Sequence, residues 1–487
     1  MKNFDVITHA EERNVKLVLK GLLVGIITAF IVVLYRFSLS YAEDFAFFIY
    51  SFIKTHKYLI PLWFIVLIVI AFIVGKLIDR EPYIGGTLAI ISGLSLGREG
   101  PSVQLGACTG DILSKKFNST RLERRLLMSS GATAGLAAAF NAPLSGVLFS
   151  LEEIYKYFSP LVLLATITSA VAADFISKQF FGLNPVFHFA DTVPIPLGDY
   201  WLLLLLGILL GAFGAFYNWF TLKTQDVYAK LKCSSSIKLM IPFLLAGILG
   251  LLFPVVLCGG HAIVEELNLT STLGLLLLML VAKFLFSTIS FGSGAPGGIF
   301  FPLLIIGGTF GAVFGYIAIN YLGISPDLFN NFIILSMAGY FTAIVRAPIT
   351  GIILITEMTG SFSHLLSLTI VSIIAYIVAD LLKSAPIYDS LLEGLLLKND
   401  INEYHSHSNK KIIIINVVHF GSKIEKTTLS SLDLPENTLI VSIKRGEDSI
   451  VPKGNTIIRA GDTILTMTDL KNECKVRELM DSLTTVE

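Results

Sequence analysis

Long apolar runs alternate with short polar segments over most of the chain. Each run has about twenty residues, enough for a helix to cross the roughly 30 Å hydrocarbon core of a bilayer. The pattern predicts membrane-spanning helices over residues 16–38, 58–77, 159–177, 198–220, 237–258, 271–291, 303–322 and 364–383. We therefore expect an all-α polytopic membrane protein.

Shorter apolar pieces, broken by glycine and proline, lie between these runs. They cover residues 85–96, 101–113, 127–140, 143–155, 331–345 and 348–358. Pieces of this length cannot cross a membrane alone, and membranes tolerate broken helices only where they are buried in protein or line a cavity. The pattern is typical of transporters and channels.

The pattern changes from about residue 408, where apolar and polar positions begin to alternate. The segments "KKIIIINVV", "ENTLIVSIKRG" and "NTIIRAGDTILTM" predict strands separated by turn residues. The last segment, "LKNECKVRELMDSL", has the periodicity of a helix. The chain therefore ends in a small α/β domain.

Composition agrees with a membrane protein and excludes several other classes. The chain is 54% hydrophobic and 15% charged, whereas soluble proteins carry about 25% charged residues. Lys plus Arg and Asp plus Glu number 36 each, so no basic excess suggests nucleic acid. The four cysteines lie far apart and predict neither a metal site nor a disulfide framework. No cleavage site follows the first apolar run, which predicts a membrane helix rather than a removed signal peptide.

Two pairs of segments repeat at nearly the same offset. "NAPLSGVLFSLEE" (141–153) matches "RAPITGIILITEM" (346–358) at an offset of 205, and the match aligns Glu152 with Glu357. "GREGPSVQLGA" (97–107) matches "GIFFPLLIIGG" (298–308) at an offset of 201. Internal symmetry with Gly/Pro-broken helices in corresponding positions predicts a substrate site where the two repeats meet.

The matched segments "GREGP" and "GIFFP" each predict the start of a helix. Helix N-termini expose free N–H groups and a partial positive charge, so two of them together would bind an anion. Two interpretations of Glu99 fit this arrangement. Its carboxylate could occupy the anion's place and leave when protonated, or it could simply complement the dipole of its own helix.

Four motifs together resemble the CLC family of chloride channels and proton-coupled chloride antiporters. They are "GREGP", "GIFFP" within "GSGAPGGIFFP", "NAPLSGVLFSLEE", and the tyrosine of "APIYDSLLEG" (385–394). The resemblance covers about residues 15–397. It implies a homodimer with one pore per subunit, in which each chain has two inverted halves with broken re-entrant helices, at about 15–180 and 198–397.

The resemblance also implies a role for each matched residue. Glu99 resembles the gating and proton glutamate, and Glu153 resembles the internal proton glutamate that marks antiporters. The implied anion-binding groups are the amides of Ile299 and Phe300 and the hydroxyl of Tyr388. The motif glycines and prolines form the helix ends around the anion. They are Gly97, Gly100, Pro101, Gly298 and Pro302.

Without the resemblance, three residues have other interpretations. Glu153 could lie at a solvated helix end, and Tyr388 could be an interfacial aromatic residue. Lys283, within an apolar run, could extend its amine to the membrane surface or lend positive potential to an anion path.

The expected function is chloride transport, most simply the exchange of two chloride ions for one proton. The alternative within the same family is a passive voltage- or pH-gated chloride channel. A cation transporter would need acidic or carbonyl-lined sites, and an intramembrane protease would need motifs that this sequence lacks. We expect no enzyme activity, no cofactor and no metal. The expected partners are a second copy of the chain, the bilayer, chloride and protons, in a bacterial inner membrane with both termini cytoplasmic.

The tail resembles a TrkA-C (RCK C-terminal) domain, which implies a regulatory input from a small ligand of unknown identity. The expected division of the chain is a cytoplasmic segment at 1–14, a CLC-type transmembrane domain at 15–397, a linker at 398–409 and a TrkA-C-like domain at 410–487. Two histidines in the linker, His405 and His407, fit a solvated linker better than a metal site.

The chain departs from the family at one place. The family's Gly-Ser-Gly-Ile-Pro motif, whose serine binds the anion, does not precede "GREGP". Only the apolar piece 85–96 stands there, and at 1.5 Å per residue it would span about 18 Å, too short to cross a membrane. The sequence therefore predicts a missing segment between Tyr83 and Gly85 and a weakened anion site.

Overall fold

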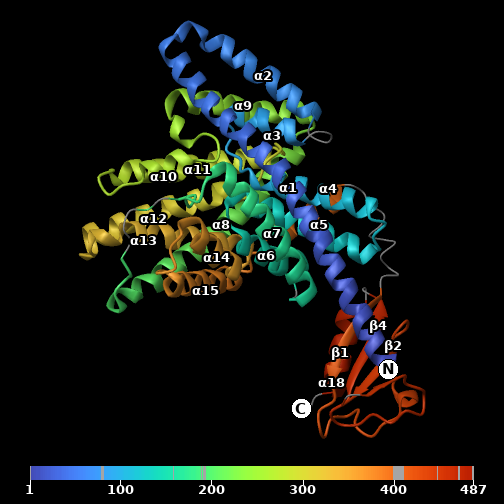
Figure 1. Cartoon of the computed structure of the whole chain (residues 1–487). Helices are drawn as coiled ribbons and strands as arrows, with labels where there is room; N and C mark the ends of the chain where they lie inside the picture. The colour runs from blue at the N-terminus through green and yellow to red at the C-terminus, as the bar shows by residue number, and fades with distance from the viewer. Residues whose placement is uncertain are drawn as a thin grey trace. The chain divides into compact units, whose positions relative to one another are not determined.

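The computed structural model describes residues 2–77, 82–156, 158–187, 189, 193–398, 411–446, 448–469 and 472–484. The chain forms two compact units, Met1–Leu391 and Leu392–Glu487 (Figure 1). Most of the expected linker at 398–409 lies outside the described residues.

The first unit is built mainly of helices, and the last of these continues past Leu391 into the second unit. Its helices, in chain order, are α1 (Lys2–Thr55), α2 (Ile60–Leu77), α3 (Pro82–Ile91), α4 (Glu99–Lys116), α5 (Arg121–Phe140), α6 (Pro143–Phe149), the π-helix η2 (Ser150–Tyr155), α7 (Pro160–Phe181), α8 (Tyr200–Lys230), α9 (Ser235–Leu252), α10 (His261–Glu266), α11 (Leu273–Gly292), α12 (Phe300–Leu322), α13 (Phe329–Val345), α14 (Pro348–Thr359), α15 (Leu365–Leu381) and α16 (Ile387–Lys398). Four 3-10 turns join them, at Lys57–Leu59, Leu197–Asp199, Pro254–Val256 and Pro326–Leu328. Within the described residues, eight helical segments are long and apolar enough to cross a membrane.

Among the predicted elements that need correction, three bear on which segments are long enough to span a membrane. The first helix continues to Thr55 instead of ending near residue 38, because no glycine or proline interrupts the largely apolar stretch that follows. The piece predicted at 331–345 is extended by the turn at Pro326–Leu328 and becomes long enough to span. The helix in the run predicted at 364–383 is shorter than predicted: α15 covers Leu365–Leu381 and has 17 residues.

The repeated segments occupy equivalent places in the two halves of this unit. α4 packs against α5, and α12 packs against α13. A methyl group on Gly110 of α4 would collide with the carbonyl of Leu127, and one on Gly311 of α12 would collide with the carbonyl of Phe332. Gly110 and Gly311 correspond at the repeat offset of 201, and Leu127 and Phe332 correspond at the offset of 205. Small residues therefore bring the backbones of both helix pairs into close contact, as is common in membrane helices.

The two halves meet through a reciprocal backbone bridge. The amide of Gly97 donates to the carbonyl of Gly298 at 2.7 Å, and the amide of Gly298 donates to the carbonyl of Gly97 at 2.8 Å. The bridge is antiparallel. Because the two glycines are equivalent in the repeat, a two-fold axis relates the halves here, as expected for inverted repeats.

The second unit is a small α/β domain. Strands β1 (Lys411–Val417), β2 (Leu439–Arg445), β3 (Asp448–Ile450) and β4 (Thr463–Asp469) form an antiparallel sheet in the order β1-β4-β2-β3. Helix α18 (Glu473–Thr484) adds Val476 and Met480 to its apolar core. The α/β prediction for the tail is confirmed.

An ion pair joins β2 to the turn before β4. Arg445 donates from Nε and Nη2 to the two oxygens of Asp462, at 2.8 and 2.7 Å. Burial alone would raise the pKa of Asp462, but the bonds from Arg445 and from the Arg459 amide hold the pKa below its usual value. The carboxylate therefore stays charged inside the domain.

Candidate functional site

The carboxylate of Glu99 lies where two helices begin. Glu99 is the first residue of α4, and Phe300 is the first residue of α12. Glu99 Oε1 accepts hydrogen bonds from the amides of Phe300 at 2.5 Å and Phe301 at 3.2 Å. The residue is 3% exposed, and Oε2 is buried with no partner among the described residues. A negative group thus occupies an N-terminal anion site.

The sequence singled out the amides of Ile299 and Phe300 as the anion donors. The structure brings Phe300 to Glu99, and the second amide there belongs to Phe301. Ile299 is the buried N-cap residue of α12. The assignment of Ile299 and Phe300 to a free anion stays a prediction. The sequence did not single out Phe301, because its amide is chosen by the direction in which Glu99 points.

Aromatic rings surround the start of α12. The ring of Phe300 lies 5.2 Å from that of Phe140 and 4.7 Å from that of Phe341. Phe149 links Phe300 to Tyr388, with ring distances of 6.4 and 5.9 Å. Tyr388 is the second residue of α16. It therefore reaches the same aromatic cluster as the Glu99 site, and its role as an anion ligand stays a prediction.

A cavity of about 340 Å³ opens beside this site. Gly97, Arg98 and Phe301 line it, together with Arg36 and Asn141. The guanidinium of Arg98 lies over the rings of Phe140 and Phe301, at 5.8 and 5.7 Å. The lining of the cavity therefore carries two guanidinium groups next to the backbone that holds Glu99, and it also includes Glu43.

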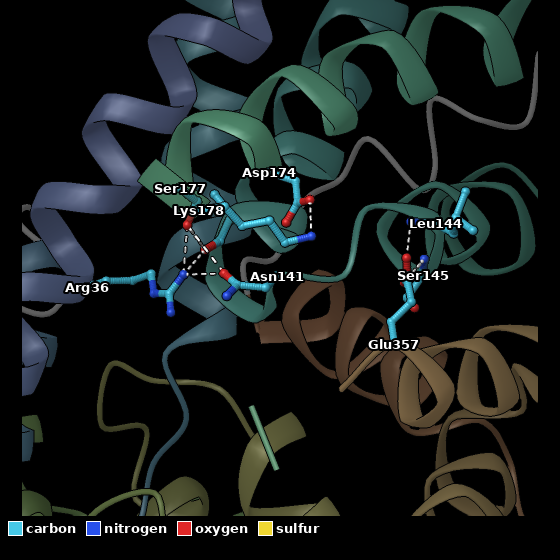
Figure 2. Close-up of polar contacts among 9 residues, drawn as sticks. Arg36, Asn141, Leu144, Ser145, Asp174, Ser177, Lys178 and Glu357 are labelled. Carbon is cyan, nitrogen blue, oxygen red and sulfur yellow. Dashed lines mark hydrogen bonds and ion pairs between the residues drawn. The ribbon is translucent and has the colours of Figure 1, made fainter. Parts of the chain in front are cut away.

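Arg36 is a component of this cavity that the sequence analysis missed. Its Nη1 donates to Ala138 O at 2.6 Å and to Asn141 Oδ1 and Ser177 Oγ, both at 2.8 Å (Figure 2). The side chain lies 3.8 Å over the ring of Phe181. An arginine inside a long apolar run was the available signal, because charge at membrane depth is rare without a partner or a cavity.

Glu153 lies in a segment of unusual helical form. It belongs to the π-helix η2, which continues α6, and it is partly buried. Lys156, just after η2, donates to both oxygens of Asp389 at 2.7 Å. Asp389 directly follows Tyr388, so this ion pair ties the Glu153 segment to the start of α16. π-Helical turns occur often at functional sites.

The neighbouring residue, Glu152, contacts the other half of the molecule. Its carboxylate accepts from the amides of Ile349 and Thr350, at 3.1 and 2.7 Å, and from Thr350 Oγ1 at 2.6 Å. The side chain of Glu152 therefore points toward α14. Two adjacent acids of similar sequence context have different surroundings, which the sequence could not show.

Lys283 is fully buried in α11 and does not reach the membrane surface. Its amine donates to the carbonyls of Val256 at 3.0 Å and Cys258 at 2.9 Å. These bonds tie α11 to the irregular segment before α10. Of the two interpretations, the structure excludes the one in which the amine extends to the surface.

The described residues around Tyr83 and Gly85, where the sequence predicts a missing segment, pack against other helices. α3 has 10 residues, whereas α11, which precedes "GIFFP" in the other half, has 20. Tyr83 of α3 packs on Tyr35 with a ring distance of 5.1 Å, and its hydroxyl lies 2.5 Å from Ser38 Oγ. Gly85 packs against Pro296 of the other half. The helix before "GREGP" is thus half as long as its counterpart.

Among the residues that the structure describes, no three or more His, Cys, Asp or Glu side chains gather as a metal site would require.

Comparisons with known proteins agree on one family. The profile of the family described as voltage gated chloride channel matches residues 82–380, and the TrkA-C domain profile matches residues 413–480. The H(+)/Cl(-) exchange transporter ClcA of Vibrio vulnificus (strain YJ016) is 41% identical over 329 residues, which cover 65% of this chain and 70% of that protein. ClcA of Vibrio cholerae serotype O1 (strain M66-2) is 38% identical over 332 residues, 66% of this chain and 70% of that protein.

A solved structure shares the fold. The crystal structure of a slow cyanobacterial Cl−/H+ antiporter superposes with a TM-score of 0.73 at 26% identity, over 78% of this chain and 98% of that one. The CLC resemblance, the inverted-repeat helical fold and the TrkA-C assignment of the tail are confirmed.

Proposed function

Because this chain belongs to the voltage-gated chloride channel (CLC) family, we propose that it exchanges chloride for protons across a membrane. Members of this family are transporters and not enzymes, and they need no cofactor beyond the transported ions. The relatives named above are proton/chloride exchangers. We propose the same activity here, with two chloride ions moving against one proton.

The observation that carries this proposal is the bond between Glu99 and the start of α12. Its carboxylate accepts from the amides of Phe300 and Phe301, where a chloride ion would otherwise accept. Only one anion can use these donors at a time. A proton that reaches Glu99 removes its negative charge, frees the amides and admits chloride. Proton and chloride occupancy are thereby coupled at one site.

The second part of the proposal assigns the remaining residues. Glu153 passes protons between the aqueous phase on one side and the Glu99 site. When Glu99 is protonated and leaves, the freed amide of Phe300 binds chloride together with the amide of Ile299 and the hydroxyl of Tyr388. The ring of Phe149, which lies beside the rings of both Tyr388 and Phe300, supports this assignment.

The proposal also includes the setting of the transporter. The chain acts as a homodimer in a bacterial inner membrane, with one pore in each subunit and both termini in the cytoplasm. The TrkA-C domain binds a small ligand that adjusts the rate.

Simultaneous recording of chloride and proton flux from purified protein in liposomes tests the proposal, with Glu99→Gln as the informative variant. Glutamine has the shape of the protonated acid but cannot take up or release a proton. We expect its chloride flux to lose nearly all pH dependence and its proton flux to disappear.

Two results would contradict the proposal. Chloride flux without proton movement in the unmodified protein would indicate a passive channel. A Glu99→Gln variant with unchanged pH dependence would leave Glu99 as a partner of its own helix dipole only.

A further inference from the structure

Two carboxylates join the halves of the molecule in a reciprocal way. Glu357 of α14 accepts from the amides of Leu144 and Ser145, at 3.0 and 2.8 Å, and from Ser145 Oγ at 2.5 Å (Figure 2). Glu152 of η2 makes the same three bonds to Ile349 and Thr350. Each glutamate therefore caps the helix of the other half.

These contacts follow the internal repeat. Glu152 and Glu357 are equivalent at the offset of 205, as are Ser145 and Thr350. Both α6 and α14 begin with a proline, and neither has a capping side chain of its own. The free amides of their first turns need acceptors when buried. A carboxylate from the opposite half supplies them, and charge-assisted bonds of this kind are strong and directional.

The consequence concerns the segment that carries Glu153. Glu357 holds its beginning at Leu144 and Ser145, and Glu152 holds its end to α14. A hydroxyl contact between Thr133 and Ser150, at 2.5 Å, adds a third tie to α5. The π-helical turn between these ties departs from regular helix geometry. A segment with an irregular turn keeps one orientation only if its ends are held.

We propose that Glu357 is a positioning residue for Glu153: by capping the first turn of α6, it fixes the orientation in which Glu153 passes protons. This inference rests on the proposed function, because it takes Glu153 as the proton glutamate. Glu357 acts as a hydrogen-bond acceptor and does not itself carry the proton. Loss of the cap lets the α6–η2 segment shift, while the chloride donors on α12 stay in place.

A matched pair of variants in the full chain, reconstituted in liposomes, separates these roles. Glu357→Gln keeps an acceptor oxygen but cannot carry a proton, whereas Glu357→Met has similar length and no acceptor. We expect Gln to keep the ratio of proton to chloride flux near that of the unmodified protein. Met should lower that ratio about 10- to 100-fold, since a misplacement of about 1 Å has effects of this size, with chloride flux retained.

Two further variants complete the test. Thr359→Val is the control on α14, because the Thr359 hydroxyl donates to Ile355 O within the same helix and its loss should leave the ratio unchanged. If Glu357→Met does not fold, Ser145→Ala removes one of the three bonds. A smaller drop in the ratio would then support the proposal, and an unchanged ratio would overturn it.

The other outcomes are equally decisive. Equal loss of coupling in Glu357→Gln and Glu357→Met would make Glu357 a proton carrier, and normal coupling in both would remove any role in coupling. Either result overturns the inference. Glu153→Gln measured in parallel tests the proposed function separately: if it remains coupled, the assignment of Glu153 fails, whatever Glu357 does.

Discussion

The two halves of the transmembrane unit share their scaffold and differ in their chemistry. The residues that join the halves occur in both, as in the Gly97–Gly298 bridge and the exchanged caps of Glu152 and Glu357. At the repeat offsets, however, Glu99 stands opposite Phe300, and Glu153 stands opposite Met358. The first half therefore contributes both proposed proton-handling acids, while the second half contributes apolar side chains and backbone donors.

This difference shows how a symmetric scaffold serves an asymmetric task. A two-fold axis brings two helix N-termini together, and each could bind an anion. The first half has a carboxylate where the second half has an apolar side chain, so one helix end supplies the competitor and the other supplies the donors. Proton coupling at the site needs this difference between the two helix N-termini. Two N-termini with apolar side chains would bind chloride but would have no group that takes up a proton.

The largest effect should come from removing the carboxylate of Glu153, which the second half lacks at the equivalent position, Met358. Glu153→Gln removes the only proposed proton-handling acid on the α6–η2 segment. We expect proton flux to disappear while chloride flux survives, because the anion donors are on α12. The volume-conserving change Met358→Leu, at the equivalent position, should leave both fluxes intact. Proton coupling that persists in Glu153→Gln would show that the acid is a structural helix end.

A smaller effect should follow from restoring the family's serine motif before the shorter helix. α3 is half as long as α11, and the anion-binding serine of the family is absent before "GREGP". A hydrogen bond to a charged group contributes about 1.5–3 kcal/mol, so inserting a Gly-Ser-Gly-Ile-Pro segment between Tyr83 and Gly85 should tighten chloride binding about 10- to 100-fold.

Calorimetric titration of both forms with chloride measures this difference, and thermal unfolding of both tests whether the shorter form is also less stable. Equal chloride affinity would mean that the backbone amides and Tyr388 suffice, and that the short α3 is no loss to the site.

The smallest effect should come from the part of the chain outside the repeat. The TrkA-C domain has its own sheet and apolar core. Removal of 408–487 should change the transport rate but leave the order of preference among chloride, bromide and nitrate unchanged. Competition flux assays measure that order, and a different order after removal would show that the tail shapes the anion path.

The sequence by itself determined the class of fold and the position of most elements. Apolar runs of about twenty residues predict spanning helices because only a closed backbone hydrogen-bond pattern is stable in lipid. Alternating positions after residue 408 predicted three strands of the sheet, which appear at Lys411–Val417, Leu439–Arg445 and Thr463–Asp469; the short strand Asp448–Ile450 was not predicted. The repeat in "NAPLSG" and "RAPITG" predicted that two halves would meet. The hydrophobic patterns are local signals, and the repeat is found by comparing one part of the sequence with another.

Only the tertiary structure decided which groups touch. Phe301 shares with Phe300 the amides that hold Glu99, Arg36 joins the cavity beside Arg98, and Glu152 caps α14. Each of these contacts joins segments that are far apart in the chain, and its direction depends on how the helices pack and on which rotamer that packing allows. A pattern along the sequence records which residues are apolar or charged, but not which of two adjacent carboxylates faces which neighbour.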